Sequence, residues 1–88
     1  MNPFGYYFQV PDEISQLEAQ HGVGLHQLGV GERWSLIHVL SEWVITGKLQ
    51  VDEDWAIASK ICDAIGKYSE DNRVFVIEAI VKSIVSAL

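Results

Sequence analysis

The chain has 88 residues, 49 % of them apolar, and its 12 acidic and 6 basic residues give a formal net charge of −6. This length corresponds to one small domain. The six cations are scattered between Arg33 and Lys82 without forming a basic stripe, which argues against nucleic acid or an anionic membrane surface as a partner. No segment approaches the ~18 consecutive apolar residues of a membrane span, and the first residues lack the pattern of a secretory signal. With a single cysteine, Cys62, we expect a cytoplasmic protein.

The first ten residues contain four of the nine aromatic residues of the chain: Phe4, Tyr6, Tyr7 and Phe8. Gly5 and Pro11 bracket this cluster, and both residue types disfavour a helix there. We therefore predict an extended aromatic arm over residues 1–10. Aromatic side chains bury a large area at low rotamer cost, so this arm is expected to bind a partner or to take part in assembly.

A short helix is predicted over residues 11–21. Pro11 suits the first turn of a helix, and Asp12 and Glu13 follow it where the helix dipole favours acidic side chains. Gly22 ends the helix. Residues 22–31 contain four glycines and are predicted to form a loop.

Three longer helices are predicted over residues 32–46, 52–68 and 70–87. Gly47 is a good C-terminal residue for the first, Asp52 is the expected N-cap of the second, and Ser69 or Asp71 caps the third. The predicted fold is a single all-α domain over residues 1–88, a small bundle of three main helices plus a short N-terminal helix, preceded by the extended aromatic arm.

The predicted helix 32–46 has two apolar faces. One face, which includes Leu36, Leu40 and Trp43, is expected to pack in the core. The opposite face carries a second stripe with the spacing i, i+4, i+7 and i+11, formed by Trp34, His38, Ser41 and Ile45. Two interpretations stay open: the stripe contacts a partner, or the aromatic arm folds back and covers Trp34. Both hold if the arm is exchanged between protomers.

The predicted helix 70–87 has an apolar arc over about half of its circumference, more than a helix packed on one side needs. It is therefore expected to lie between neighbours. Together with the high apolar content of so short a chain, this arc predicts association into a homodimer.

No arrangement in the sequence has the spacing of a catalytic or cofactor site. His38 and Glu42 share a helical face at i, i+4, but a zinc or iron site needs three or four converging ligands. Asp52, Glu53 and Asp54 lack the glycine and the glutamate that a calcium loop of the EF-hand type requires further along. We therefore predict no metal, no cofactor and no enzymatic activity.

The predicted function is that of a small acidic regulatory or adaptor protein that acts through protein–protein contacts as a homodimer. The expected contact residues are the stripe of Trp34, His38, Ser41 and Ile45, together with Phe4, Tyr6, Tyr7 and Phe8 of the arm. Two alternatives stay open. One is a carrier that encloses an apolar small molecule between its helices, and the other is a metal-binding or enzymatic protein that uses His38 and Glu42.

Overall fold

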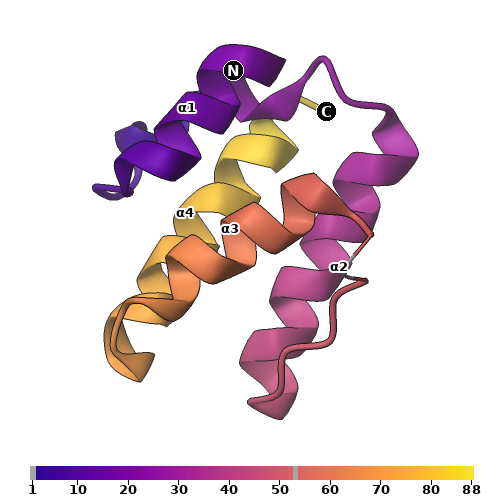
Figure 1. The fold of residues 1–88 in the computed structure, drawn as a ribbon. Helices are drawn as coiled ribbons and strands as arrows, with labels where there is room; N and C mark the ends of the chain where they lie inside the picture. The colour runs from indigo at the N-terminus through magenta and orange to yellow at the C-terminus, as the bar shows by residue number, and fades with distance from the viewer. Residues whose placement is uncertain (1, 53) are drawn as a thin grey trace.

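Helices account for all the regular structure in the computed structural model, which describes residues 2–52 and 54–88. Four α-helices and two single turns of 3₁₀ helix follow one another along the chain (Figure 1). In order they are η1 (Phe4–Tyr6), α1 (Asp12–His21), η2 (Val23–Leu25), α2 (Val30–Thr46), α3 (Ala56–Gly66) and α4 (Glu70–Ser86). No strand occurs within these two ranges, and the prediction of an all-α fold is confirmed.

Local chemistry sets the ends of the longer helices. Gly47 adopts a left-handed conformation with φ of 71°, and its N–H donates to the Trp43 carbonyl at 2.9 Å, which ends α2. Before α4, the Ser69 side chain accepts a hydrogen bond from the Asn72 N–H at 3.4 Å, as an N-cap residue does.

Helix α3 starts at Ala56, four residues after the predicted N-cap Asp52. The Asp52 side chain accepts from the Asp54 N–H at 3.0 Å, and its carbonyl accepts from the Trp55 N–H at 3.0 Å. These two bonds close a turn instead of opening a helix, because aspartate side chains compete for nearby backbone donors. The start predicted at Asp52 is thus too early.

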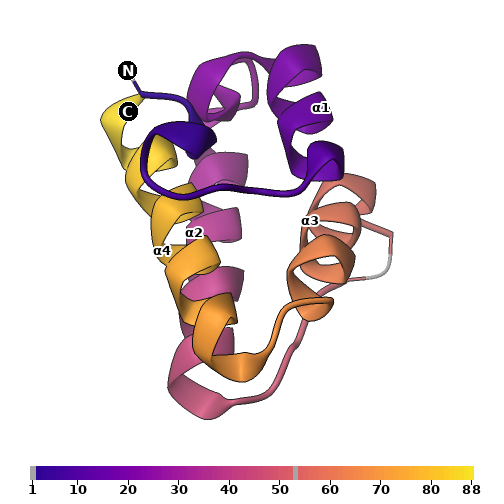
Figure 2. The same ribbon diagram turned by 90° about the vertical axis from the view of Figure 1, so that its left-hand side faces the viewer.

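The four α-helices form two layers (Figure 2): α2 and α4 pack together in one, and α1 and α3 pack together in the other. Helices α2 and α4 run antiparallel. Near one end, Arg33 Nη1 donates to the Ala87 carbonyl at 3.1 Å, and near the other end the Arg73 guanidinium lies 5.0 Å from the centre of the Trp43 ring. Every element contributes apolar side chains to the core between the layers, including Phe4, Ile14, Leu25, Leu36, Leu40, Ile61, Ile65, Ile80 and Ile84.

The N-terminal segment differs from the predicted extended arm. Pro3 precedes one turn of 3₁₀ helix, and the turn places Phe4 in the core with none of its surface exposed. The Phe4 N–H donates to Glu18 Oε2 at 2.9 Å, and the Ser83 hydroxyl donates to the Asn2 carbonyl. The segment therefore packs on α1 and α4 of its own chain, and it leaves α2 uncovered.

Candidate functional site

The α2–α4 layer lies on one side of the molecule and the α1–α3 layer on the other (Figure 2), and both α2 and α4 carry exposed apolar side chains. Trp34 is 54 % exposed and Ile45 is 82 % exposed. We call this surface the α2/α4 face, and its exposed apolar members are Val30, Trp34, Val44, Ile45, Val74, Val85 and Leu88.

Sequence spacing explains why these side chains gather on one face. On α2, Val30, Trp34 and Val44 lie at i, i+4 and i+14, and on α4, Val74 and Val85 lie at i and i+11, so that each set forms a stripe along its helix. A groove joins the end of α2 to the start of α4, and it is lined by Val44 and Val74 together with Glu70, Asp71 and Arg73. The antiparallel packing then places Trp34 and Val85 at the opposite end of the same layer. The two stripes therefore run side by side.

The predicted contact residues of α2 lie where the helical spacing placed them, with Trp34, His38 and Ile45 exposed and Ser41 half-buried. Trp43, by contrast, is only 7 % exposed, so the two tryptophans of α2 do point in different directions. Trp34 is not covered by the N-terminal segment, and the interpretation in which that segment seals it inside one chain is wrong.

His38 and Glu42 form an exposed pair, with 2.9 Å between His38 Nε2 and Glu42 Oε2. The pair supplies two of the three or four ligands that a zinc or iron site would need. In residues 2–52 and 54–88 no group of three or more His, Cys, Asp or Glu side chains is placed to hold a metal ion. Chemically, the pair is a surface ion pair whenever the imidazole is protonated.

The four aromatic residues near the N-terminus divide into a buried anchor and an exposed set. Phe4 belongs to the core and has no surface with which to touch a partner in this structure. Tyr6 is exposed and meets the half-buried Tyr7 edge to face, with ring centres 5.0 Å apart. Phe8 stacks on Phe75 of α4, with ring centres 6.2 Å apart and an angle of 16° between the rings.

The stacked rings form a second apolar surface, distinct from the α2/α4 face. Phe75 is 55 % exposed, and the Phe8 ring that stacks on it covers part of its ring. The ion pair between Lys82 and Glu78, 2.7 Å between Nζ and Oε1, lies on the exposed side of α4 between Phe75 and Val85. Charged side chains therefore separate the two apolar surfaces.

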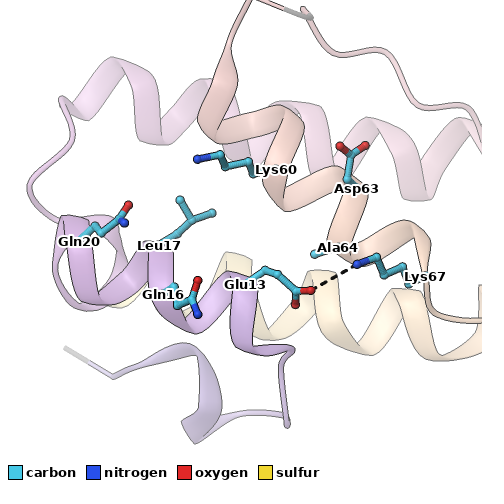
Figure 3. A pocket seen from close by; sticks show the side chains of 8 residues that line it. All are labelled: Glu13, Gln16, Leu17, Gln20, Lys60, Asp63, Ala64 and Lys67. Carbon is cyan, nitrogen blue, oxygen red and sulfur yellow. Dashed lines mark hydrogen bonds and ion pairs between the residues drawn. The ribbon is translucent and has the colours of Figure 1, made fainter.

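A groove of about 320 Å³ between α1 and α3 has a charged and polar lining (Figure 3). Leu17 and Ala64 are its apolar members, and the remaining side chains are Glu13, Gln16, Gln20, Lys60, Asp63 and Lys67. Glu13 and Lys67 bridge it with 3.3 Å between Oε1 and Nζ, and a backbone hydrogen bond together with this ion pair lowers the pKa of Glu13. The groove is open to solvent and has six charged or polar side chains at its walls, so it does not enclose an apolar molecule.

The one cysteine, Cys62, is buried in α3 and unbonded to another sulfur. Burial, with a smaller contribution from the charge of Asp63, raises the pKa of its thiol to about 11. A thiol with so high a pKa is almost entirely protonated at neutral pH and is a poor nucleophile.

Comparison of the chain with protein-family models, with curated proteins and with solved structures gave no match. Within the part of the chain that the structure describes, no helix is both long enough and apolar enough to cross a bilayer. What the chain does is therefore inferred from its own surfaces.

Two groups of surface residues were absent from the sequence-based set. Val30, Val44, Val74, Val85 and Leu88 extend the α2/α4 face, and the wide apolar arc of helix 70–87 was the signal for most of them. The helical spacing predicts Val44 on the core face beside Trp43, but it is 43 % exposed because it lies at the edge of that face. Phe75 belongs to the second surface. Phe75 shares its helical face with the charged Asp71, Glu78 and Lys82, at i−4, i+3 and i+7, and this spacing could have identified it as an outward-facing residue.

Proposed function

We propose that the chain is a non-enzymatic regulatory or adaptor protein of the cytoplasm that works as a homodimer, with a second copy bound to the α2/α4 face. The observation that supports this proposal is the group of exposed apolar side chains on that face, contributed by two packed helices. A surface helix that has no partner normally carries charged and polar side chains on its solvent-exposed side.

The charge of the chain restricts where a second copy can bind. Each copy carries a net charge of −6, so two copies repel one another except where their contact surface is neutral. The seven apolar side chains of the α2/α4 face are uncharged, whereas Glu70, Asp71 and Arg73 line the groove at one end of it. A basic protein partner would instead be recognised by acidic residues within the contact surface.

The size of the face also fits a dimer. The exposed fractions of its six aliphatic side chains correspond to about three fully exposed ones, and with Trp34 they expose roughly 400 Å² of apolar surface. A standard interface buries about 800 Å² on each partner, of which somewhat more than half is apolar. At about 25 cal/mol per Å², the two copies gain roughly 20 kcal/mol in gross terms, and association costs about 4–15 kcal/mol. The balance allows a stable dimer.

A two-fold axis suits the arrangement of the helices. In such a dimer, the two antiparallel helices of one copy pack on the same two helices of the other, so the contact is self-complementary. The result is a central four-helix layer, an arrangement in which apolar stripes with three- and four-residue spacing interlock. Neither of the other two interpretations gains a specific observation, since the groove of Figure 3 is charged and His38 with Glu42 forms only a pair.

Light scattering on size-exclusion fractions tests the proposal. The wild-type chain is expected to be a dimer at tens of micromolar, and Val85→Lys is expected to be monomeric because it places two ammonium groups in the contact. Gln16→Lys is the matched control, because it adds the same charge at an exposed position on α1. A monomeric wild type, or equal masses for Val85→Lys and Gln16→Lys, would contradict the proposal.

A further inference from the structure

The stripe on the outer side of α2 has a residue spacing that is the same in both directions. Trp34, His38, Ser41 and Ile45 are separated by four, three and four residues, with the two apolar side chains at the ends and the two polar ones between them. Such a stripe is self-complementary in an antiparallel pair of helices, because it has the same spacing from either end. A second copy of α2, turned end to end, places its Ile45 opposite Trp34 and its Ser41 opposite His38.

The exposed valines of α4 fit the same arrangement. Val74 and Val85 are both exposed and lie 11 residues apart, as Trp34 and Ile45 do. At the rise of an α-helix, the two members of each pair are about 16 Å apart along their helix. An antiparallel second copy of α4 therefore places its Val85 opposite Val74.

The midpoints of the two sets lie side by side in the layer. Arg33 of α2 donates to the Ala87 carbonyl near one end of the layer, and the Trp43 ring lies against Arg73 of α4 near the other. The midpoint of the α2 stripe lies within two residues of the point midway between Arg33 and Trp43, and the midpoint of the two valines lies within one residue of the point midway between Arg73 and Ala87. One two-fold axis across the layer can therefore relate both helices to their copies at once.

A two-fold axis that runs along the helices is the other way to pair the two faces, and the charges disfavour it. That axis would pack α2 of one copy on α4 of the other and would bring the starts of both α4 helices to the same end of the dimer. Glu70 and Asp71 line the groove at this end, so four carboxylates would gather there, and like charges brought together oppose association. An axis across the helices instead separates the two acidic ends by about 25 Å, the length of a 17-residue helix such as α4.

We propose that the two copies join with α2 packed antiparallel on α2 and α4 packed antiparallel on α4, about a two-fold axis that crosses both helices near their midpoints. This inference rests on the proposed homodimer and adds the register of its contact. Trp34 of each copy packs on Ile45 of the other, and Val74 of each copy packs on Val85 of the other. His38 and Ser41 meet at the centre, where a polar pair sets the register, because a shifted pairing would place a polar group against an apolar side chain.

Distances between spin labels on the two copies test this arrangement. The labels are attached to Ser35→Cys or Lys48→Cys, two exposed positions outside the stripe, in a Cys62→Ala background that leaves only the new thiol. In the proposed dimer, a label at position 35 of one copy and a label at position 48 of the other are offset by about 6 Å along the helices. Two labels at position 35 are offset by about 14 Å, and two labels at position 48 by about 26 Å. The mixed pair is therefore expected to give the shortest of the three distances.

The axis along the helices predicts the opposite order. Equal positions then lie at the same level, and the mixed pair is offset by about 20 Å. A dimer in which the mixed pair does not give the shortest distance would overturn the proposed register and leave the homodimer standing, whereas a monomeric wild type would overturn both. Circular dichroism and light scattering check that each labelled variant keeps the helical content and the mass of the wild type.

Discussion

Trp34 and Trp43 lie on the same helix, but truncation to alanine is expected to affect association at Trp34 and stability at Trp43. Trp43 is 7 % exposed in the core and lies against Arg73, whereas Trp34 is 54 % exposed on the α2/α4 face. Trp43→Ala is therefore expected to lower the free energy of unfolding by about 3–5 kcal/mol. Trp34→Ala is expected to act mainly on association.

The effect of Trp34→Ala follows from its exposed area. A tryptophan buries up to about 250 Å², so a dimer contact covers roughly 100 Å² of each Trp34, or about 2.5 kcal/mol per copy at 25 cal/mol per Å². Both copies lose this contact. We allow for repacking around the alanine and expect a total loss of about 3–5 kcal/mol, which raises the dimer dissociation constant about 10²–10⁴-fold.

Sedimentation velocity over a dilution series gives the dissociation constant, and urea unfolding at a concentration where all variants are monomeric gives the stability. Trp43→Ala is expected to lose stability under these conditions, and Trp34→Ala is expected to change it by much less. Equal losses of stability in the two variants, with an unchanged dissociation constant for Trp34→Ala, would refute the assignment of Trp34 to a contact surface.

Three further predictions concern the fold. A Cβ on Gly24, whose φ is +63°, would lie 2.6 Å from the Ser83 carbonyl oxygen. Gly24→Ala should therefore lower the free energy of unfolding by roughly 2–4 kcal/mol, measured by heat or denaturant. The control Gly31→Ala, where a Cβ on α2 meets open space, should be neutral or stabilising by up to about 1 kcal/mol. Phe4→Ala should cost about 3–5 kcal/mol, and Tyr6→Ala, 69 % exposed, should cost far less; similar melting temperatures for the two would contradict the burial of Phe4. Burial raises the pKa of Cys62 to about 11, so the thiol of the unfolded chain ionises at a lower pH than that of the folded chain. The contribution of the neutral thiol to stability is complete below pH 9 and should fall by up to about 2–3 kcal/mol as the pH rises towards 11. A pH series of melts should show a smaller loss of stability for Cys62→Ala.

Periodicity along the sequence predicted the four α-helices, though not all of their bounds, and the opposite directions of the two tryptophans of α2. Trp43, Leu36 and Leu40 recur at the spacing of one buried face, and Trp34 lies off it, so their burial follows from geometry alone. Gly47 and Ser69 carry local signals for a helix end and a helix start, and the structure uses both. In such places local chemistry and tertiary packing agree.

The N-terminal segment could not be predicted in the same way, because its conformation depends on distant partners. Phe4 is buried by contacts with the rest of the core, and its N–H is satisfied by Glu18, 14 residues further along. Glu18 Oε2 also accepts from the Gly24 N–H at 3.2 Å, which joins η1 and η2 through one carboxylate. A pattern of aromatic residues beside Gly5 gives no information about such long-range bonds.

The location of Arg33 shows a second limit of sequence reasoning. It was counted among the scattered cations of the chain, yet it is only 6 % exposed and donates to the Ala87 carbonyl at the end of α4. A buried arginine can be accommodated because helix C-terminal carbonyls lack partners within the helix and carry a partial negative charge. The antiparallel packing of α2 on α4 creates this contact, and no local pattern around Arg33 indicates it.

The most direct test of the central claim is a filtered nuclear Overhauser experiment on dimers formed from ¹³C-labelled and unlabelled copies of the full chain. It detects only contacts between copies. We expect such contacts from the Trp34 ring and from Ile45 to methyl groups on the α2/α4 face of the other copy. Contacts between copies that involve the α1–α3 groove or Phe75 in place of these residues, or no contacts at a concentration of hundreds of micromolar, would contradict a homodimer joined through the α2/α4 face.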